Sequence, residues 1–188
     1  MLRHPGGRAC CYSPGLMRVF PVIRVLALSV IAVACASHKP SASVTPAGAD
    51  MSGSWDRLKQ GLSGTWSTIP EQGRSLEISY RVVSYGTALL ETFGAKPDEQ
   101  TLSVYHPDGR GLMLTHYCAQ GNQVRLRATE ASADRITFVY IDATNVDARQ
   151  SVMHKLVFVL GPDTLDRTEV YRALDGTEET SVVHLVRK

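Results

Sequence analysis

A series of short runs in which apolar and polar residues alternate fills the chain between residues 75 and 187. In Ser75–Ser84, for example, every second residue is apolar, a period of two that is typical of a half-buried strand. Turn signals separate the runs, among them the hairpin sequences Pro107–Arg110 and Leu174–Thr177. The one helical pattern of this region, Ser54–Leu62, is short, with Ser54 as its candidate cap. The chain therefore predicts an all-β fold of about ten antiparallel strands behind a short N-terminal helix.

Short hairpin loops join most of these runs, so neighbouring strands are expected to pair in sequence order. A meander of this kind can close into an up-and-down barrel, which removes the exposed sheet edges. A sandwich of two sheets is the alternative. The hairpin series favours the barrel.

An apolar run before this domain predicts export. Val25–Cys35 follows Arg18 and Arg24, is too short to span a membrane, and ends in small residues. The final Ala32–Cys35 resembles a bacterial lipobox, in which Cys35 would be lipidated; an ordinary signal cleaved after Ala34 is the alternative. The predicted organisation is a signal peptide at 1–34 (of which 1–16 is either a gene-model extension before Met17 or a long leader), a lipidated cysteine and Ser/Ala/Pro-rich disordered tether at 35–53, and a barrel domain at 54–188.

The composition excludes some classes of protein. The chain has 20 Lys and Arg against 18 Asp and Glu, and the charges are interspersed, so nothing suggests a nucleic-acid partner. Residues 54–188 contain a single cysteine, Cys118, so the domain has no internal disulfide. We expect a monomer held at the membrane by its lipid.

The helix that leads into Leu62–Trp66, followed by the hairpin series, resembles the calycin group of lipocalins, fatty-acid-binding proteins and nitrobindin-like barrels. More specifically, Tyr105–Gly109 together with Leu114–Gln123 looks like a signature of a bacterial lipocalin-like domain of unknown function. The resemblance implies that Trp66 plugs the closed end of the barrel. Nitrobindin-like barrels hold haem through a histidine near the C-terminus, where His184 lies, but the glycines that follow their first Gly-x-Trp are absent here.

Histidine and cysteine residues form the first group of candidate site residues. His116 and Cys118 are two apart on one strand and therefore share a face. Strand alternation places His154 with Leu156 and Phe158, on a face that should point inward. We expect these side chains to converge in the lumen. They are either ligand-binding groups, ligands of zinc or copper, or core residues that hydrogen-bond their neighbours.

Arginine, tyrosine and glutamate residues form the second group. In fatty-acid-binding barrels an inward arginine and a tyrosine hold a carboxylate, and Arg127 with Tyr140 or Tyr80 is the candidate pair here. The alternative places Arg125 and Arg127 in solvent. Glu91 lies between apolar residues on one face and is expected to be an inward carboxylate paired with one of these arginines.

No catalytic motif is visible in the sequence. The prediction is therefore a lipid-anchored protein of the bacterial envelope, at the outer membrane and facing the periplasm, that binds a small apolar or amphipathic ligand in its lumen without a cofactor. The alternatives are an enzyme with a lumenal His/Cys site, and a structural protein with a filled barrel.

Overall fold

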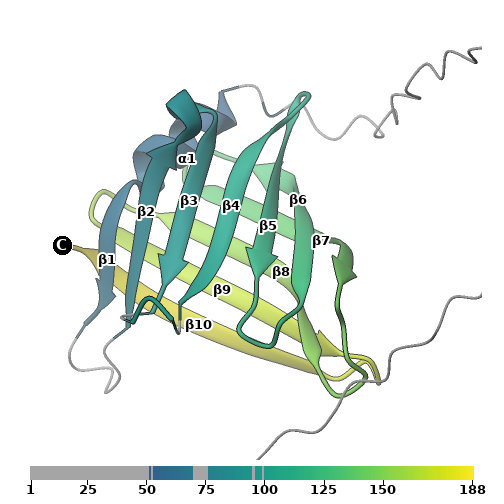
Figure 1. Cartoon of the computed structure of the whole chain (residues 1–188). Helices are drawn as coiled ribbons and strands as arrows, with labels where there is room; N and C mark the ends of the chain where they lie inside the picture. The colour runs from purple at the N-terminus through teal and green to yellow at the C-terminus, as the bar shows by residue number, and fades with distance from the viewer. Residues whose placement is uncertain (1–50, 52, 70–75, 95, 99) are drawn as a thin grey trace, which may run out of the picture. The chain divides into compact units, whose positions relative to one another are not determined.

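The computed structural model describes residues 51, 53–69, 76–94, 96–98 and 100–188, so the predicted signal peptide and tether lie outside the described residues. One helix and ten strands follow in order, with a short 3-10 turn after the second strand (Figure 1): α1 Ser54–Leu62, β1 Gly64–Thr68, β2 Glu77–Val83, η2 Ser84–Gly86, β3 Ala88–Phe93, β4 Thr101–Asp108, β5 Gly111–Tyr117, β6 Gln123–Ala131, β7 Arg135–Thr144, β8 Ser151–Leu160, β9 Thr164–Ala173 and β10 Glu178–Arg187.

The strands form a closed barrel in which each strand is antiparallel to the next. Closure occurs at β1, which pairs with β2 on one side and with β10 on the other. The predicted up-and-down barrel of about ten strands is confirmed, and the sandwich alternative is wrong. Closure satisfies the backbone groups that the two edge strands of an open sheet would leave unpaired.

Alternation along the strands fills the interior with large side chains. Tyr80, Tyr105, Phe138 and Phe158 are each at most 3% exposed, and their rings contact one another at centroid distances of 5.7–6.5 Å. Edge-to-face and tilted contacts of this kind stabilise an aromatic core beyond the area that it buries. The middle of the barrel is therefore packed rather than hollow.

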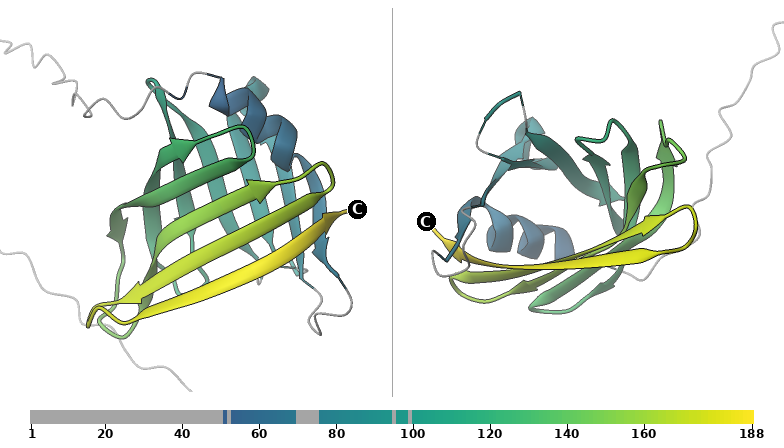
Figure 2. Two further views of the ribbon diagram at one scale, coloured as in Figure 1. Left: turned by 180° about the vertical axis from the view of Figure 1, so that it is seen from behind. Right: turned by 90° about the horizontal axis from the view of Figure 1, so that it is seen from below.

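Helix α1 covers one end of the barrel, and the end-on view of Figure 2 shows it inside the outline of the strands. Leu58 and Leu62 of its apolar face are fully buried. The expected cap is wrong: Gly53 occupies the N-cap position and Ser54 is the first helical residue, where its hydroxyl accepts a hydrogen bond from Arg57. The amphipathic pattern, rather than the cap, fixes this helix on the barrel.

Trp66 lies beneath the helix and is fully buried, in agreement with the plug that the resemblance implies. Its Nε1 donates to the carbonyl of Leu62 at 2.7 Å. Arg187 stacks on the indole at 4.3 Å and donates to the carbonyls of Ser63 and Gly61. The guanidinium thus satisfies helix-end carbonyls and joins the last strand to the plug.

Candidate functional site

An ion pair between Glu91 of β3 and Arg167 of β9 crosses the interior of the barrel. Both side chains are at most 2% exposed. Two guanidinium nitrogens donate to the two carboxylate oxygens, Nη1 at 2.7 Å and Nη2 at 3.0 Å. Arg167 also donates from Nε to Glu169 at 2.6 Å and from Nη1 to the Tyr80 hydroxyl at 2.8 Å. The bidentate geometry is the strong form of this interaction, and it uses most of the donors of the arginine.

The Glu91 carboxylate has two further donors. The hydroxyl of Tyr105 donates to Oε2 in a very short hydrogen bond, and the hydroxyl of Ser103 donates to Oε1 at 3.1 Å. Each oxygen therefore accepts two hydrogen bonds, which is the full capacity of an ionised carboxylate. A buried charge is tolerated only when it is paired and hydrogen-bonded in this way.

Burial alone would raise the pKa of Glu91, but the charge of Arg167 and the hydrogen bonds from Arg167 and Tyr105 together outweigh burial, so the pKa lies below its ordinary value. Burial and the negative charge of Glu91 raise the pKa values of Tyr80 and Tyr105 well above the ordinary range. At neutral pH the carboxylate is therefore ionised and both phenols keep their protons.

His116 extends this network toward one end of the barrel. Its Nδ1 lies 3.0 Å from the Ser103 hydroxyl oxygen. Because Ser103 gives its only proton to Glu91, its oxygen must accept the proton of His116 Nδ1. The network thus assigns the tautomer, with the proton on Nδ1 and a lone pair on Nε2. His116 is 3% exposed, and its Nε2 has no hydrogen-bond partner among the described residues.

The electrostatic setting keeps this imidazole neutral. Burial lowers the pKa of His116, and this effect outweighs the attraction of Glu91 for the protonated ring. A neutral ring with an unoccupied Nε2 is a hydrogen-bond acceptor and a potential proton acceptor.

A pocket of about 120 Å³ adjoins His116, and we call it the mouth pocket. It is lined by Phe93, Thr101, His116, Cys118, Arg167, Glu169 and Tyr171. Phe93 is the last residue of β3, Thr101 is the first of β4, and Cys118 directly follows β5. Helix α1 lies at the opposite end, where Trp55 bonds the Gly86 carbonyl in the turn between β2 and β3. The mouth pocket thus lies at the end of the barrel opposite the helix.

Acidification is expected to destabilise the barrel in two stages. The pKa of His116 is depressed from 6.5, so the unfolded chain takes up this proton first and stability falls as the pH drops below about 6.5. The pKa of Glu91 is depressed from 4.5, so its contribution is present above that value and is lost as the pH falls further. Urea unfolding measured between pH 8 and pH 3 tests this.

The matched variants are His116→Gln and His154→Gln. His116→Gln should remove the loss of stability that begins below about pH 6.5. His154→Gln should leave most of that loss in place, because His154 is partly exposed. A stability curve that is flat between about pH 7 and pH 5 would contradict the assignment of His116.

Arg127 does not line the lumen, and the expectation that it would do so is wrong. It alternates along β6 with Leu126 and Ala128, which are both buried. Because successive side chains of a strand point to opposite faces, the two apolar residues take the inside and Arg127 takes the outer wall. There it forms an ion pair with Asp108 at 2.6 Å. Arg125 likewise pairs with Asp142 on the outer wall, in agreement with the alternative prediction that both arginines face solvent.

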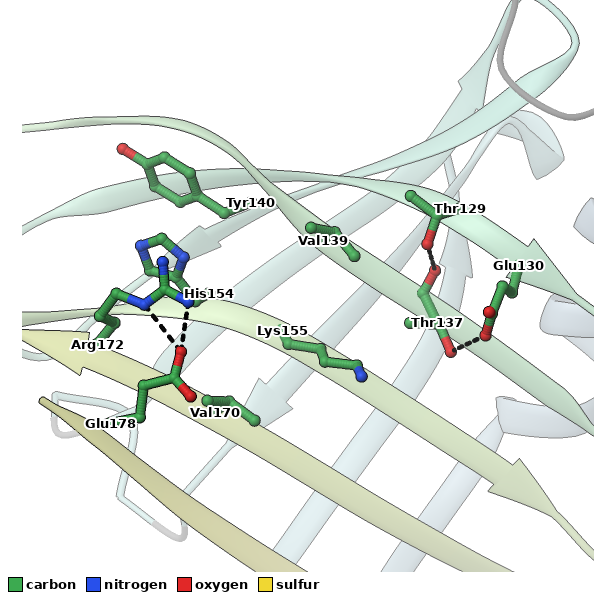
Figure 3. Close-up of a pocket in the computed structure, with 10 residues that line it drawn as sticks. All are labelled: Thr129, Glu130, Thr137, Val139, Tyr140, His154, Lys155, Val170, Arg172 and Glu178. Carbon is green, nitrogen blue, oxygen red and sulfur yellow. Dashed lines mark hydrogen bonds and ion pairs between the residues drawn. The ribbon is translucent and has the colours of Figure 1, made fainter. Parts of the chain in front are cut away.

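His154 and Tyr140 also lie apart from His116, in a groove of about 620 Å³ on the outer wall (Figure 3). Their rings stack at a centroid distance of 4.4 Å. The prediction that His154 points into the lumen is wrong because β8 has a bulge between Met153 and Lys155, which shifts the alternation by one residue and places Met153 in the core. Around the stacked pair the groove is lined by charged side chains, including the paired Arg172 and Glu178.

Of the other candidate residues, Glu91 lies in the interior of the barrel and Cys118 lies at its end. Glu91 is inward as expected, but its partner is Arg167 rather than Arg125 or Arg127. Cys118 lines the mouth pocket with His116. Sequence reasoning missed Arg167, although it shares a strand face with Leu165 and Tyr171. That signal was weak because β9 carries charged residues on both faces.

His184, the residue considered for haem, is half exposed, and its Nδ1 contacts Asp166 at 2.7 Å. In the described part of the chain no cluster of three or more His, Cys, Asp or Glu residues is arranged to hold a metal ion. Among the same residues no helix has the length and the apolar character that a membrane-spanning helix needs.

No protein-family model matches the sequence, and no curated protein matches it. The fold and the site thus define a closed ten-stranded antiparallel barrel with a buried ion-pair network and a small pocket at the end opposite α1.

Proposed function

We propose that this protein binds a small amphipathic ligand in the mouth pocket. The observation that carries the proposal is the Nε2 atom of His116, a buried hydrogen-bonding atom beside a cavity with no partner among the described residues. Leaving such an atom unsatisfied costs about 1–3 kcal/mol. A ligand that supplies its hydrogen bond recovers this free energy.

The size of the pocket limits the ligand. Typical small-molecule sites measure about 300–1,000 Å³, whereas an engineered cavity of about 150 Å³ is enough for benzene. At about 120 Å³ the mouth pocket suits one ring or a short alkyl segment. Phe93 and Tyr171 supply apolar contacts, and His116 supplies the polar one. The packed aromatic core argues against a long acyl chain threaded through the barrel.

Three one-ring probes of similar size test the proposal: phenol, toluene and benzoate. At least one of them is expected to bind the wild-type protein, measured by calorimetry, and to slow the alkylation of Cys118 by iodoacetamide, because that thiol lines the pocket. The substitution Cys118→Phe should abolish binding by filling the cavity.

His154→Leu is the matched control. It removes a histidine from the outer groove and should leave probe binding unchanged. If none of the three probes binds, or if Cys118→Phe binds them as well as the wild type does, the mouth pocket is not a ligand site and a purely structural barrel becomes the better explanation.

A second candidate function is proton transfer, with His116 as a general base. The chain from Glu91 through Ser103 to His116 Nδ1 fixes the ring and leaves Nε2 basic, as such a role requires. The substitution His116→Gln separates the two functions. Glutamine can place an acceptor near the Nε2 position but cannot take up a proton at neutral pH, so binding would persist and catalysis would cease.

We also propose that the barrel is the lipocalin-like domain of an envelope lipoprotein anchored through Cys35, at the outer membrane and facing the periplasm. The support is the apolar run Val25–Cys35, which ends in a lipobox-like sequence. Cells that express the protein should incorporate radiolabelled palmitate into it, and Cys35→Ser should prevent this and release the protein from the membrane, because the acyl chains supply the affinity. Absence of label in the wild type would contradict the anchor.

A further inference from the structure

The two unsatisfied polar atoms among the described buried side chains are both hydrogen-bond acceptors. One is Nε2 of His116, for which the Ser103–Glu91 chain assigns the lone pair. The other is Oδ1 of Asn122, a fully buried residue. An acceptor in a buried site is satisfied only by a group that brings a proton.

The orientation of the Asn122 amide follows from its neighbours. Gln150 donates from Nε2 to the backbone carbonyl of Gln120 at 2.6 Å, so its Oε1 is the atom left to face Asn122. Asn122 donates to that oxygen from Nδ2 at 3.2 Å, which leaves its own oxygen as the free atom.

Asn122 and His116 belong to the same end of the barrel. The amide of Cys118 donates to the carbonyl of Asn122 at 3.0 Å across the turn between β5 and β6. His116 pairs with Val124 one step further along the same hairpin. Both residues therefore lie next to Cys118 in this hairpin, and of the two only His116 lines the mouth pocket.

Most of the guanidinium donors of Arg167, the one cationic side chain among the described residues that line the pocket, are already in use. Arginine has five N–H groups, and Arg167 makes four hydrogen bonds, three to the carboxylates of Glu91 and Glu169 and one to Tyr80. The network therefore places two carboxylates against one guanidinium. A ligand carboxylate that paired with Arg167 in the same bidentate way would have to displace Glu91, and any ligand carboxylate would add to an excess of negative charge.

From this arrangement we infer that the ligand of the mouth pocket is a hydrogen-bond donor, a small alcohol, phenol or amine, and that the pocket discriminates against carboxylates. The inference rests on the proposed function, since it names the class of ligand for the same pocket. It also reverses the expectation that an inward arginine captures a ligand carboxylate, because an internal carboxylate already occupies that position.

The dissociation constants of phenol, toluene and benzoate test the inference by calorimetry on the whole protein. Phenol should bind at least about fivefold more tightly than toluene, since it satisfies a buried acceptor that toluene leaves unpaired. Benzoate should bind more weakly than toluene. His116→Leu should weaken the binding of phenol and leave the binding of toluene unchanged, so that the two dissociation constants become nearly equal. His116→Gln should restore much of the preference for phenol.

Two results would overturn the donor inference while leaving the proposed function intact: benzoate binding most tightly, or toluene matching phenol in the wild type, with Cys118→Phe abolishing the binding in either case. A preference for phenol that survives in a folded His116→Leu variant would also overturn it, because His116 would not then be the acceptor. Failure of all three probes to bind would instead remove the proposed function itself.

Discussion

Arg167→Met is expected to destabilise the barrel by about 3–5 kcal/mol, because it leaves the Glu91 carboxylate buried without its counter-charge. Methionine keeps most of the side-chain volume, so the loss would reflect the charge rather than a cavity. The free energy of unfolding in urea at neutral pH measures the effect. Because Glu91 must be ionised to pair with Arg167, the variant should also lose much of its acid sensitivity below about pH 4.5.

Two further variants make this experiment specific. Arg127→Met removes an arginine from an ion pair on the outer wall and should cost no more than about 1 kcal/mol. The double variant Glu91→Leu/Arg167→Met should be more stable than Arg167→Met alone, because no charge remains buried. If Arg167→Met costs as little as Arg127→Met, the Glu91–Arg167 pair does not hold the barrel together.

Trp66→Ala is the second substitution with a large expected effect, a loss of about 3–5 kcal/mol. It opens a cavity under α1 and removes the hydrogen bond to Leu62 and the ring on which Arg187 stacks. Loss of the plug should also free the helix, so hydrogen exchange is expected to rise first in Ser54–Leu62. Urea unfolding and exchange measured by mass spectrometry together test both effects.

Trp55→Ala is the matched control for Trp66→Ala. Trp55 is partly buried and bonds the Gly86 carbonyl at 3.3 Å, so its removal should cost clearly less. A loss under about 1 kcal/mol for Trp66→Ala would mean that the indole is not part of the core and that Trp66 does not plug the barrel.

The strands and their order could be predicted from local patterns in the sequence. Alternation over Glu77–Val83 and the Asp-Gly turn after β4 are local signals, and each can be recognised in the sequence without knowledge of the partner strand. Gly109 has a φ of 59°, a backbone conformation that glycine adopts at little cost and that this tight hairpin uses. The burial of Glu91 and His116 also followed from alternation, whereas the burial of Trp66 was an expectation from the resemblance to the calycin group.

Which polar residues meet inside the barrel could not be predicted from the sequence, because it depends on how distant strands come together. Arg167 and Glu91 are separated by 76 positions in the sequence, and nothing local to either strand indicates the other. The bulge next to Lys155 moved His154 to the outer wall, since one extra residue reverses the alternation beyond it. Arg127 went outside because Leu126 and Ala128 gain more from burial than an arginine would, and Asp108 was there to pair with it. A period of two assigns residues to faces, but pairing across a closed barrel depends on register and closure, which local sequence does not encode.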